Sequence, residues 1–526
     1  MDVRNPARRR RRSTFATGCR ALNPRPRLVG PLSEQPVTTQ VLVVGAGPVG
    51  MTMASELARY GVRVRIVDKA AHRTDRSKAL VLWSRTLELF DRADCGDMFV
   101  AAGHKVLAAN IVAGDTIVGR LGMATVESPH RYALMLPQSE TERLLEEHLH
   151  RQGIRVEREV EVTTFTAGAG GVGSVLRARD GREERLETEW LIGCDGAHST
   201  VRHALGLSFR GNTLQSEWVL ADIHLEGVPF PESEIVVYWH AEGALVVLPI
   251  SPGRCRVLAD IGPSNGDPAA EPTLEQVQAI IDRRGPRGLV ASDPVWLSSF
   301  RINERMVPDY RAGRVFLAGD AAHVHSPAGG QGMNTGMHDA FNLAWKLALV
   351  CRGRCSDELL ESYSIERSAV AEQVLAASGR LTKVAVLKGR VQQAVRNTLG
   401  HALLGLAPVR RAIVNNMTEV AIHYVRSPLN GPRLRGIAGP VPGERVAPIA
   451  GQVPPGSGDA PRFALCAASD GALVELLATF KELIDPHLRP PLHAGGMWLV
   501  RPDGYAACVA ADGDAKVVAD YLGRLR

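Results

Sequence analysis

Apolar and polar positions near residue 40 predict a strand, a helix and a second strand in that order. Residues 40–44 form a short β-branched run that ends at a glycine-rich turn, residues 45–50. Apolar residues then recur at helical spacing until Gly61, and residues 62–68 alternate before ending on Asp68. This order predicts a β-α-β unit of an α/β fold.

Two later strands also end on polar turns. The apolar segment 190–194 runs into Asp195-Gly196, and the segment 314–318 runs into Gly319-Asp320. Because ligands of open α/β sheets bind at the carboxyl ends of the strands, we expect Asp320 to meet a ligand hydroxyl there. The Asp195 turn, taken alone, is also a common strand-to-helix connection.

The rest of the chain changes pattern several times. Residues 209–300 are rich in strand patterns, whereas the chain beyond residue 350 is helical to about residue 425. Residues 428–460 are rich in Pro and Gly and indicate a connector, and residues 461–526 alternate strands and helices. A chain of 526 residues exceeds a single core. It predicts about three domains of roughly 150 residues each.

Composition excludes several classes of protein. The chain is 45% hydrophobic and 22% charged, as in ordinary soluble proteins. It has no run of about 18 apolar residues that would predict a membrane span. The eight cysteines are scattered, without a Cys-x-x-Cys or a zinc-type spacing. We therefore expect reduced thiols in a reducing, cytoplasmic compartment.

The net charge of +6 does not indicate nucleic-acid binding, because it comes from one end of the chain. Residues 1–40 hold nine arginines against two acids, which leaves −1 for the rest. Such an Arg-rich, acid-poor segment is expected to be disordered over residues 1–36. Two interpretations stay open: a mitochondrial-type transit peptide, or an extension that precedes a natural start near Val37.

The first glycine turn carries candidate chemistry. Gly45 allows a tight turn, Gly47 lets the backbone approach a pyrophosphate, and Gly50 lets the helix pack close to the strand. Asp68 can accept hydrogen bonds from an adenosine ribose. A second match to this pattern, at residues 168–173, is expected to be a loop between antiparallel strands. With one dinucleotide fold, a nicotinamide coenzyme would have no Rossmann domain of its own.

A second glycine-rich segment follows Asp320. Gly329, Gly330 and Gly332 let the backbone approach a flat ring, and the helix expected from about Gln331 points its positive end at that ring. Such a dipole suits an electron-rich reduced flavin. Together with the first glycine turn, this segment predicts bound FAD.

At these residues the chain resembles the class A flavin-dependent aromatic hydroxylases, single-component monooxygenases related to para-hydroxybenzoate and phenol hydroxylases. The first glycine turn, Asp195-Gly196 and Gly319-Asp320 occur in the family's order, and the long match from Gly319 to Lys346 is the most specific. The resemblance covers roughly residues 37–510. It is strongest to the branch that contains 3-(3-hydroxyphenyl)propionate hydroxylase and actinobacterial polyketide or antibiotic oxygenases.

The resemblance implies roles for matching residues. Asp68 would bind the adenosine ribose, Asp320 the ribitol, and Gln138 the FAD. Asp195-Gly196 would serve both FAD and the pyridine nucleotide. Lys78 stands where many relatives carry arginine, so it keeps the charge and loses the planar fork.

Around the flavin ring, the resemblance places Met333 and Asn334 along the isoalloxazine and Pro327 on the substrate side. No side chain is assigned as catalytic, because the cofactor performs the chemistry. The predicted cofactor-binding residues are Gly45, Gly47, Gly50, Asp68, Lys78, Gln138, Asp195, Gly196, Gly319, Asp320, Pro327, Gly330, Gly332, Met333 and Asn334.

The implied reaction reduces FAD with NADH or NADPH and uses dioxygen to hydroxylate a phenolic or polyketide-like aromatic through a flavin C4a-hydroperoxide. The alternatives are an FAD-dependent dehydrogenase or reductase on the same fold, and a flavin-binding interaction module. No metal is expected, since His323 and His325 lack an acid–His cluster and hydrogen bonding explains them better. The expected partners are therefore small molecules. The chain is expected to be a monomer or a homodimer.

The aromatic substrate is expected under the strand-rich region. We expect Trp239 and His240 to approach the pocket, because strand alternation would send one of them inward, although ordinary sheet packing explains both as well. Hydroxylation, epoxidation and Baeyer–Villiger insertion stay open from the sequence.

The expected fold class is α/β: a Rossmann-like FAD-binding domain interleaved with a β-sheet substrate domain, a helical segment and a small thioredoxin-like C-terminal domain. The expected parts are a disordered extension (1–36), the first part of the FAD-binding domain (37–208), the substrate domain (209–300), the returning FAD-binding segment (301–350), a helical region (351–430), a linker (431–460) and the thioredoxin-like domain (461–526).

Overall fold

The structure is a computed structural model that describes residues 39–526 apart from 76, 264–270, 386, 388, 450 and 469–470. The predicted extension 1–36 lies outside the described residues. Residues 37–526 form one unit by their internal contacts.

A six-stranded sheet carries the predicted β-α-β unit. Its strands lie in the order β18 (Arg311–Ala312), β19 (Val315–Leu317), β12 (Trp190–Gly193), β1 (Val41–Val44), β2 (Val64–Asp68) and β8 (Val156–Arg158). All neighbours are parallel except β18, which pairs antiparallel with β19. Every residue of β1 and β12 is buried, which explains their unbroken apolar runs. The predicted α/β fold is confirmed.

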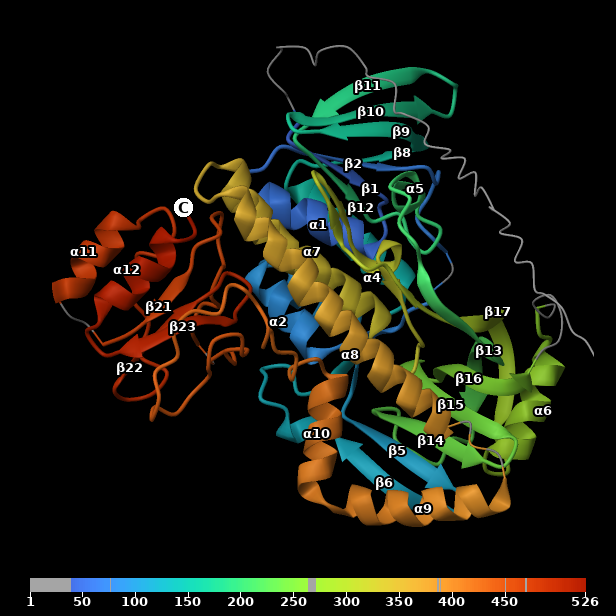
Figure 1. The fold of residues 1–526 in the computed structure, drawn as a ribbon. Coiled ribbons are helices and arrows are strands. Elements are labelled where there is room, and N and C mark those ends of the chain that lie inside the picture. The colour runs from blue at the N-terminus through green and yellow to red at the C-terminus, as the bar shows by residue number, and fades with distance from the viewer. Residues whose placement is uncertain are drawn as a thin grey trace, which may run out of the picture. The chain divides into compact units, whose positions relative to one another are not determined.

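Helices pack beside this sheet. α1 (Pro48–Arg59) follows the first glycine turn and packs against α4 (Gln138–Arg151) and α7 (Gly332–Cys351). α7 confirms the helix expected from about Gln331, and nearly its whole length is buried. α8 (Glu361–Ala385) lies beside α7, as Figure 1 shows.

The second match to the glycine pattern is a hairpin, as predicted. β9 (Val160–Gly168), β10 (Gly171–Ala178) and β11 (Glu183–Thr188) form an antiparallel sheet in which Gly171 pairs with Gly168. The glycines at 168–173 therefore serve a strand connection.

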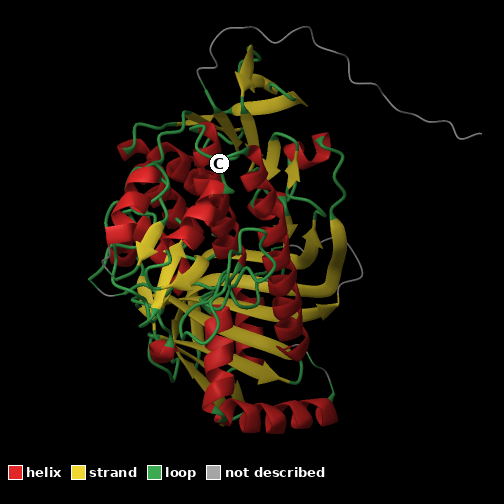
Figure 2. Cartoon of the chain, turned by 60° about the vertical axis from the view of Figure 1, so that its left-hand side comes forward, coloured by secondary structure: helices red, strands yellow, loops and turns green. Residues whose placement is uncertain are grey.

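An eight-stranded sheet occupies the strand-rich region. Its order is β20 (His323–Val324), β17 (Val290–Met306), β13 (Arg210–Glu226), β16 (Arg254–Pro263), β15 (Gly243–Ser251), β14 (Glu234–His240), β5 (Ala108–Ala113) and β6 (Thr116–Gly122). One face packs on α6 (Leu274–Arg284), and the other shares an apolar cluster with α9 (Arg390–Gly405) and α10 (Ala407–Met417). In Figure 2 the helix along the lower edge of this sheet is α9, which contacts β6.

The C-terminal part has its own antiparallel sheet. It contains β21 (Ala464–Cys466), β22 (Gly496–Val500) and β23 (Ala506–Ala511), with α11 (Gly471–Thr479) and α12 (Ala515–Gly523). The thioredoxin-like assignment stays a prediction.

The remaining elements are β3 (Val81–Leu82), β4 (His104–Val106), β7 (Ala133–Met135), α2 (Ser84–Arg92), α3 (Gly96–Ala102), α5 (Thr200–Ala204) and 3-10 turns at Met123–Thr125, Gly319–Ala321 and Asp357–Leu360. Among the described residues, no helix has both the length and the apolarity to cross a membrane.

Candidate active site

The three glycines of the first turn meet different surroundings. Gly45 has φ +101°, and a Cβ placed on it would collide with the carbonyl of Cys194. A Cβ on Gly50 would collide with the carbonyl of Gly45. At Gly47 an added Cβ would meet no described atom within 4 Å. The first and third glycines are therefore required by the fold, whereas Gly47 leaves open space at the turn where a pyrophosphate is expected.

Asp68 ties the end of β2 to this turn. Its Oδ2 accepts a hydrogen bond from the Ala46 amide at 2.6 Å, and its Oδ1 accepts one from the Ala70 amide at 2.8 Å. Each carboxylate oxygen has a second lone pair, so Asp68 can also accept bonds from ribose hydroxyls. The half-buried side chain thus fits the predicted role.

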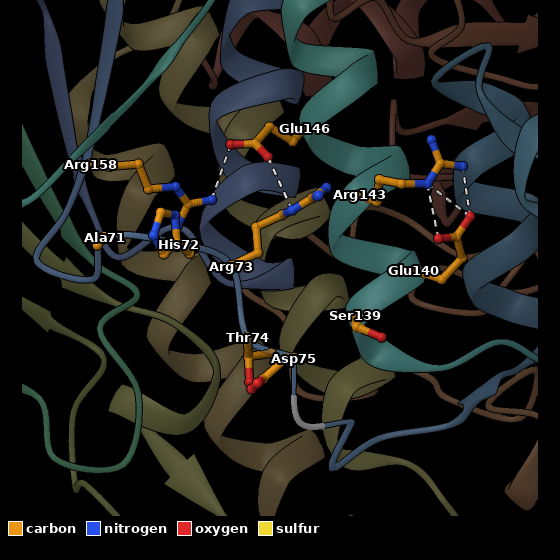
Figure 3. A pocket seen from close by; sticks show the side chains of 10 residues that line it. All are labelled: Ala71, His72, Arg73, Thr74, Asp75, Ser139, Glu140, Arg143, Glu146 and Arg158. Atoms are coloured by element: carbon orange, nitrogen blue, oxygen red, sulfur yellow. Dashed lines mark hydrogen bonds and ion pairs between the residues drawn. The ribbon is translucent and has the colours of Figure 1, made fainter. Parts of the chain in front are cut away.

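A cavity of about 590 Å³ lies between residues 71–75 and α4, with Arg158 of β8 also in its lining (Figure 3). Its arginines are neutralised by neighbouring acids: Glu146 lies 3.1 Å from Arg158 and 3.4 Å from Arg73. Arg143 pairs with Glu140 in the same way. The cavity has no excess positive charge among its lining side chains and contains none of the predicted cofactor-binding residues.

Gln138 orders the segment that carries Lys78. Its backbone amide donates to Ser77 Oγ at 2.6 Å, and its side-chain oxygen accepts from the Ala79 amide at 3.2 Å. These bonds hold the chain on both sides of Lys78, whose side chain is exposed. A contact of Gln138 with FAD remains a prediction.

Asp320 lies near enough to Lys78 for the two charges to interact. Its side chain reaches solvent, yet the surrounding protein desolvates it and raises its pKa, against the lowering effects of His323 and Lys78. Gly319, at φ +60°, would bring a Cβ into Val49, so glycine is needed to turn the chain here. An accessible, poorly solvated carboxylate at a strand end fits a ligand hydroxyl.

The Asp195 turn uses its side chain internally. Ser199 Oγ donates to Asp195 Oδ1 at 2.5 Å, and the Thr200 amide donates to Oδ2 at 2.6 Å. Ser199 in turn caps α5, as expected. The carboxylate thus caps a helix start, and Gly196, at φ +79°, leaves open space where a Cβ would be.

The second glycine loop, residues 327–332, is fixed by two buried side chains. Trp83 Nε1 donates to the carbonyls of Gly329 (3.0 Å) and Gly330 (3.2 Å). Asn334 donates through its amide nitrogen to the carbonyls of Val81 (2.8 Å) and Gly330 (3.0 Å). The Asn334 side chain is thus committed to the protein, which leaves its backbone amide to meet a ligand. Trp83 was not found from the sequence, because its partners lie about 250 positions away.

The start of α7 presents free amides toward this loop. The first backbone bond into the helix joins the Thr335 amide to the Gln331 carbonyl, so the amides of Gly332, Met333 and Asn334 precede it. Pro327 is exposed and Met333 is half-buried. This end of the helix favours negative charge on a bound ring.

A buried ion pair anchors the turn at Gly319. Asp339 accepts from the Gly319 amide (2.9 Å), from His323 Nε2 (2.9 Å) and from Arg367 Nε (2.6 Å). The hydrogen-bonding interpretation of His323 is confirmed. Burial, with a smaller effect of His323, lowers the pKa of His325 to about 4, so this imidazole is neutral at pH 7. In the described ranges no group of three or more His, Cys, Asp or Glu gathers as a metal site.

The two substrate candidates lie on opposite faces of the eight-stranded sheet. Trp239 joins the apolar cluster shared with α9 and α10, and the Arg396 guanidinium lies 4.5 Å from its ring centre. His240 faces the side of α6, where Glu242, Arg283 and Arg284 act on it electrostatically. Alternation thus turns His240 away from Trp239, and the approach of either side chain to the substrate stays a prediction.

Comparison with known proteins places this arrangement among the FAD-dependent monooxygenases. A 6-methylpretetramide 4-monooxygenase of Streptomyces rimosus is 36% identical over 89% of this chain and 90% of its own. A rifampicin monooxygenase of Streptomyces venezuelae is 33% identical over 76% and 83%. The solved anhydrotetracycline hydroxylase of Streptomyces rimosus superposes with a TM-score of 0.75 at 29% identity, covering 92% of this chain and 98% of its own.

The family of the chain is identified by a match that covers most of its length. Residues 38–378 match the model described as "FAD binding domain", and the chain belongs to that family. FAD is accordingly its cofactor, and the open space at Gly47, the accessible Asp320 and the amides that begin α7 fit that group.

Proposed function

We propose that the chain uses NADH or NADPH and dioxygen to hydroxylate a phenolic ring of a polyketide-like aromatic. One observation carries the substrate class. Trp83, which donates to the second glycine loop, and Val81, whose carbonyl accepts from Asn334, belong to the same apolar cluster as half-buried sheet residues. These sheet residues are Val237, Trp239, Val246, Leu248 and Ile250. An apolar face beside the loop supports a flat, multi-ring substrate.

The protein's own residues would bind and orient the reactants. When bound, FAD supplies the electron transfer from the nicotinamide and the activation of dioxygen. We assign the pyrophosphate to the backbone at Gly47, the ribose to Asp68 and the ribitol to Asp320. The amides that begin α7 would stabilise negative charge on the ring, and the apolar cluster would exclude water.

The test begins with the absorbance spectrum of the purified protein. We expect bound FAD, and oxidation of NADH or NADPH with oxygen uptake that a phenol or aromatic polyketide stimulates. Trp239→Ala should raise the KM for that substrate, whereas His240→Ala, its neighbour on the opposite face, should not. Turnover without oxygen uptake would instead favour the dehydrogenase alternative, and protein that takes up no FAD would contradict the assignment.

The domain boundaries, the thioredoxin-like C-terminal domain and a monomeric or homodimeric state remain proposals. A cytoplasmic location is also proposed. It is supported by the free thiols of all seven cysteines in the described part of the chain. Size-exclusion chromatography with light scattering tests the oligomeric state.

A further inference from the structure

A row of buried polar side chains runs beneath the second glycine loop. Glu419, in the turn after α10, is fully buried with φ +60°. Its Oε1 accepts from Thr335 Oγ1 at 2.7 Å, and its Oε2 lies 3.4 Å from His338 Nδ1. His338 Nε2 lies 3.0 Å from Thr86 Oγ1, and Thr86 lies 2.7 Å from Asn334 Oδ1. The row therefore leads from Glu419 to the side chain that holds the loop.

The chemistry of the groups fixes the direction of each bond. Asn334 uses its NH₂ on two carbonyls, so its Oδ1 is the acceptor. The single hydroxyl proton of Thr86 must therefore go to Asn334. Thr86 in turn can only accept from His338, which places a proton on His338 Nε2.

Glu419 Oε2 has no hydrogen-bond partner among the described residues, and at 3.4 Å from His338 Nδ1 it needs a proton on one of these two groups to form a bond. Without it, a carboxylate oxygen would face the lone pair of His338 Nδ1 in a buried site. Burial, Arg367 and Arg85 together lower the pKa of His338 well below its usual value. Burial raises the pKa of Glu419 to about 8, against the lowering effects of Thr335, Arg367 and Arg85. The proton therefore belongs to the Glu419 carboxyl at neutral pH.

We propose that protonated Glu419 is a positioning residue that acts through His338, Thr86 and Asn334 to hold the second glycine loop in the shape that receives the flavin ring. The part of this proposal that concerns the flavin ring rests on the proposed function. The end of α10, just before this turn, also holds the loop directly, since Gln331 Nε2 donates to the Asn416 carbonyl at 2.8 Å.

The proposal predicts a loop that loosens at alkaline pH. Four charged or titratable groups face the Glu419 carboxyl: His338 and Asp339 from α7, Arg367 from α8 and Arg85 from α2. Asp339 opposes ionisation of Glu419 and the two arginines favour it. Loss of the proton leaves His338 Nδ1 facing a carboxylate, so this row of bonds weakens as pH rises through about 8.

Hydrogen exchange measured by mass spectrometry tests this in the full chain, with and without FAD. The protection factor of the peptide 327–334 should fall about fivefold between pH 8 and pH 9, because the protonated fraction of a group with a pKa of about 8 falls by about that factor over this interval. Glu419→Gln cannot ionise but keeps a donor for His338 and an acceptor for Thr335. It should therefore hold protection constant. Glu372→Gln, an exposed glutamate on α8, should behave as the unaltered chain does.

Two results would overturn the proposal. One is a peptide 327–334 whose protection in the unaltered chain does not depend on pH, a result that needs no variant. The other is an alkaline transition that persists in Glu419→Gln. Because the apoprotein is measured too, a chain that fails to bind FAD would contradict the proposed function and still leave the role of Glu419 decided by the exchange data.

Discussion

Replacement of Glu366 by glutamine should destabilise the fold strongly. Glu366, on α8, accepts bonds from Lys346 Nζ (2.7 Å), from Asn342 (2.7 Å) and from both terminal nitrogens of Arg501 (2.6 and 2.9 Å). All four side chains are buried. Arg501 also binds Asp503, and both follow β22 in the C-terminal part. The cluster therefore joins α7 and α8 to that part.

The size of the expected loss in stability follows from the buried charge that Glu366→Gln leaves without a partner. Glu366 and Asp503 balance Lys346 and Arg501, so Glu366→Gln leaves one buried positive charge without a partner. Breaking such a pair costs about 3–5 kcal/mol. Burial lowers the pKa of Lys346 to about 8 even though Glu366 opposes that shift. Without Glu366 the pKa of this lysine falls further, and the easier loss of its proton places the cost near the lower end, about 3 kcal/mol.

Urea unfolding followed by circular dichroism and tryptophan fluorescence measures this loss. The matched control is Glu361→Gln on the same helix, because Glu361 pairs with Arg311 at 2.8 Å but is 67% exposed. Its loss should cost at most about 1 kcal/mol. Adding Lys346→Met to Glu366→Gln should restore part of the stability, since it removes the buried amine whose loss of a proton carries the cost. Equal midpoints for Glu366→Gln and Glu361→Gln would refute the reasoning.

Other substitutions separate fold from cofactor. Gly45→Ala, which collides with the Cys194 carbonyl, should destabilise the chain by more than about 3 kcal/mol by urea unfolding. Gly47→Ala should fold, yet weaken FAD binding about tenfold or more by fluorescence titration, a change near 1.4 kcal/mol. Trp83→Phe removes the donor to the second glycine loop and should cost about 1 kcal/mol and speed FAD release. Acid should also destabilise the chain, because its partners lower the pKa of Glu366 despite burial. That stability is present above about pH 4.5 and is lost below it, as thermal melts from pH 7 to pH 3 will measure.

Most of the fold could be predicted from local sequence patterns. The buried strands β1 and β12, the glycine turns and the extent of α7 were predictable because each depends on neighbours within a few residues. Alternation also separated Trp239 from His240, but the sequence could not say which face meets α9, since the register across the sheet depends on distant strands.

The parts of the site that escaped prediction depend on long-range contacts. Trp83, His338 and Glu419 are ordinary residues of a helix boundary, a helix and a turn. Their roles arise from partners far away in the chain, so no local motif marks them. Asn334 was assigned to the flavin ring by resemblance, and only the structure reveals that its side chain is occupied by the protein.

The residues that hold the second glycine loop are made at different times during translation. The family match ends at residue 378, yet Asn416 and Glu419 brace the loop from beyond that point, and Arg85 of α2 donates to the Asp503 carbonyl at 2.6 Å. A nascent chain of which only the matched region has left the ribosome contains every glycine of the site. It still lacks Asn416, Glu419 and Asp503. The nascent chain should therefore be unable to retain FAD until the C-terminal part has emerged, and a fragment cut at residue 378 should behave as that unfinished chain.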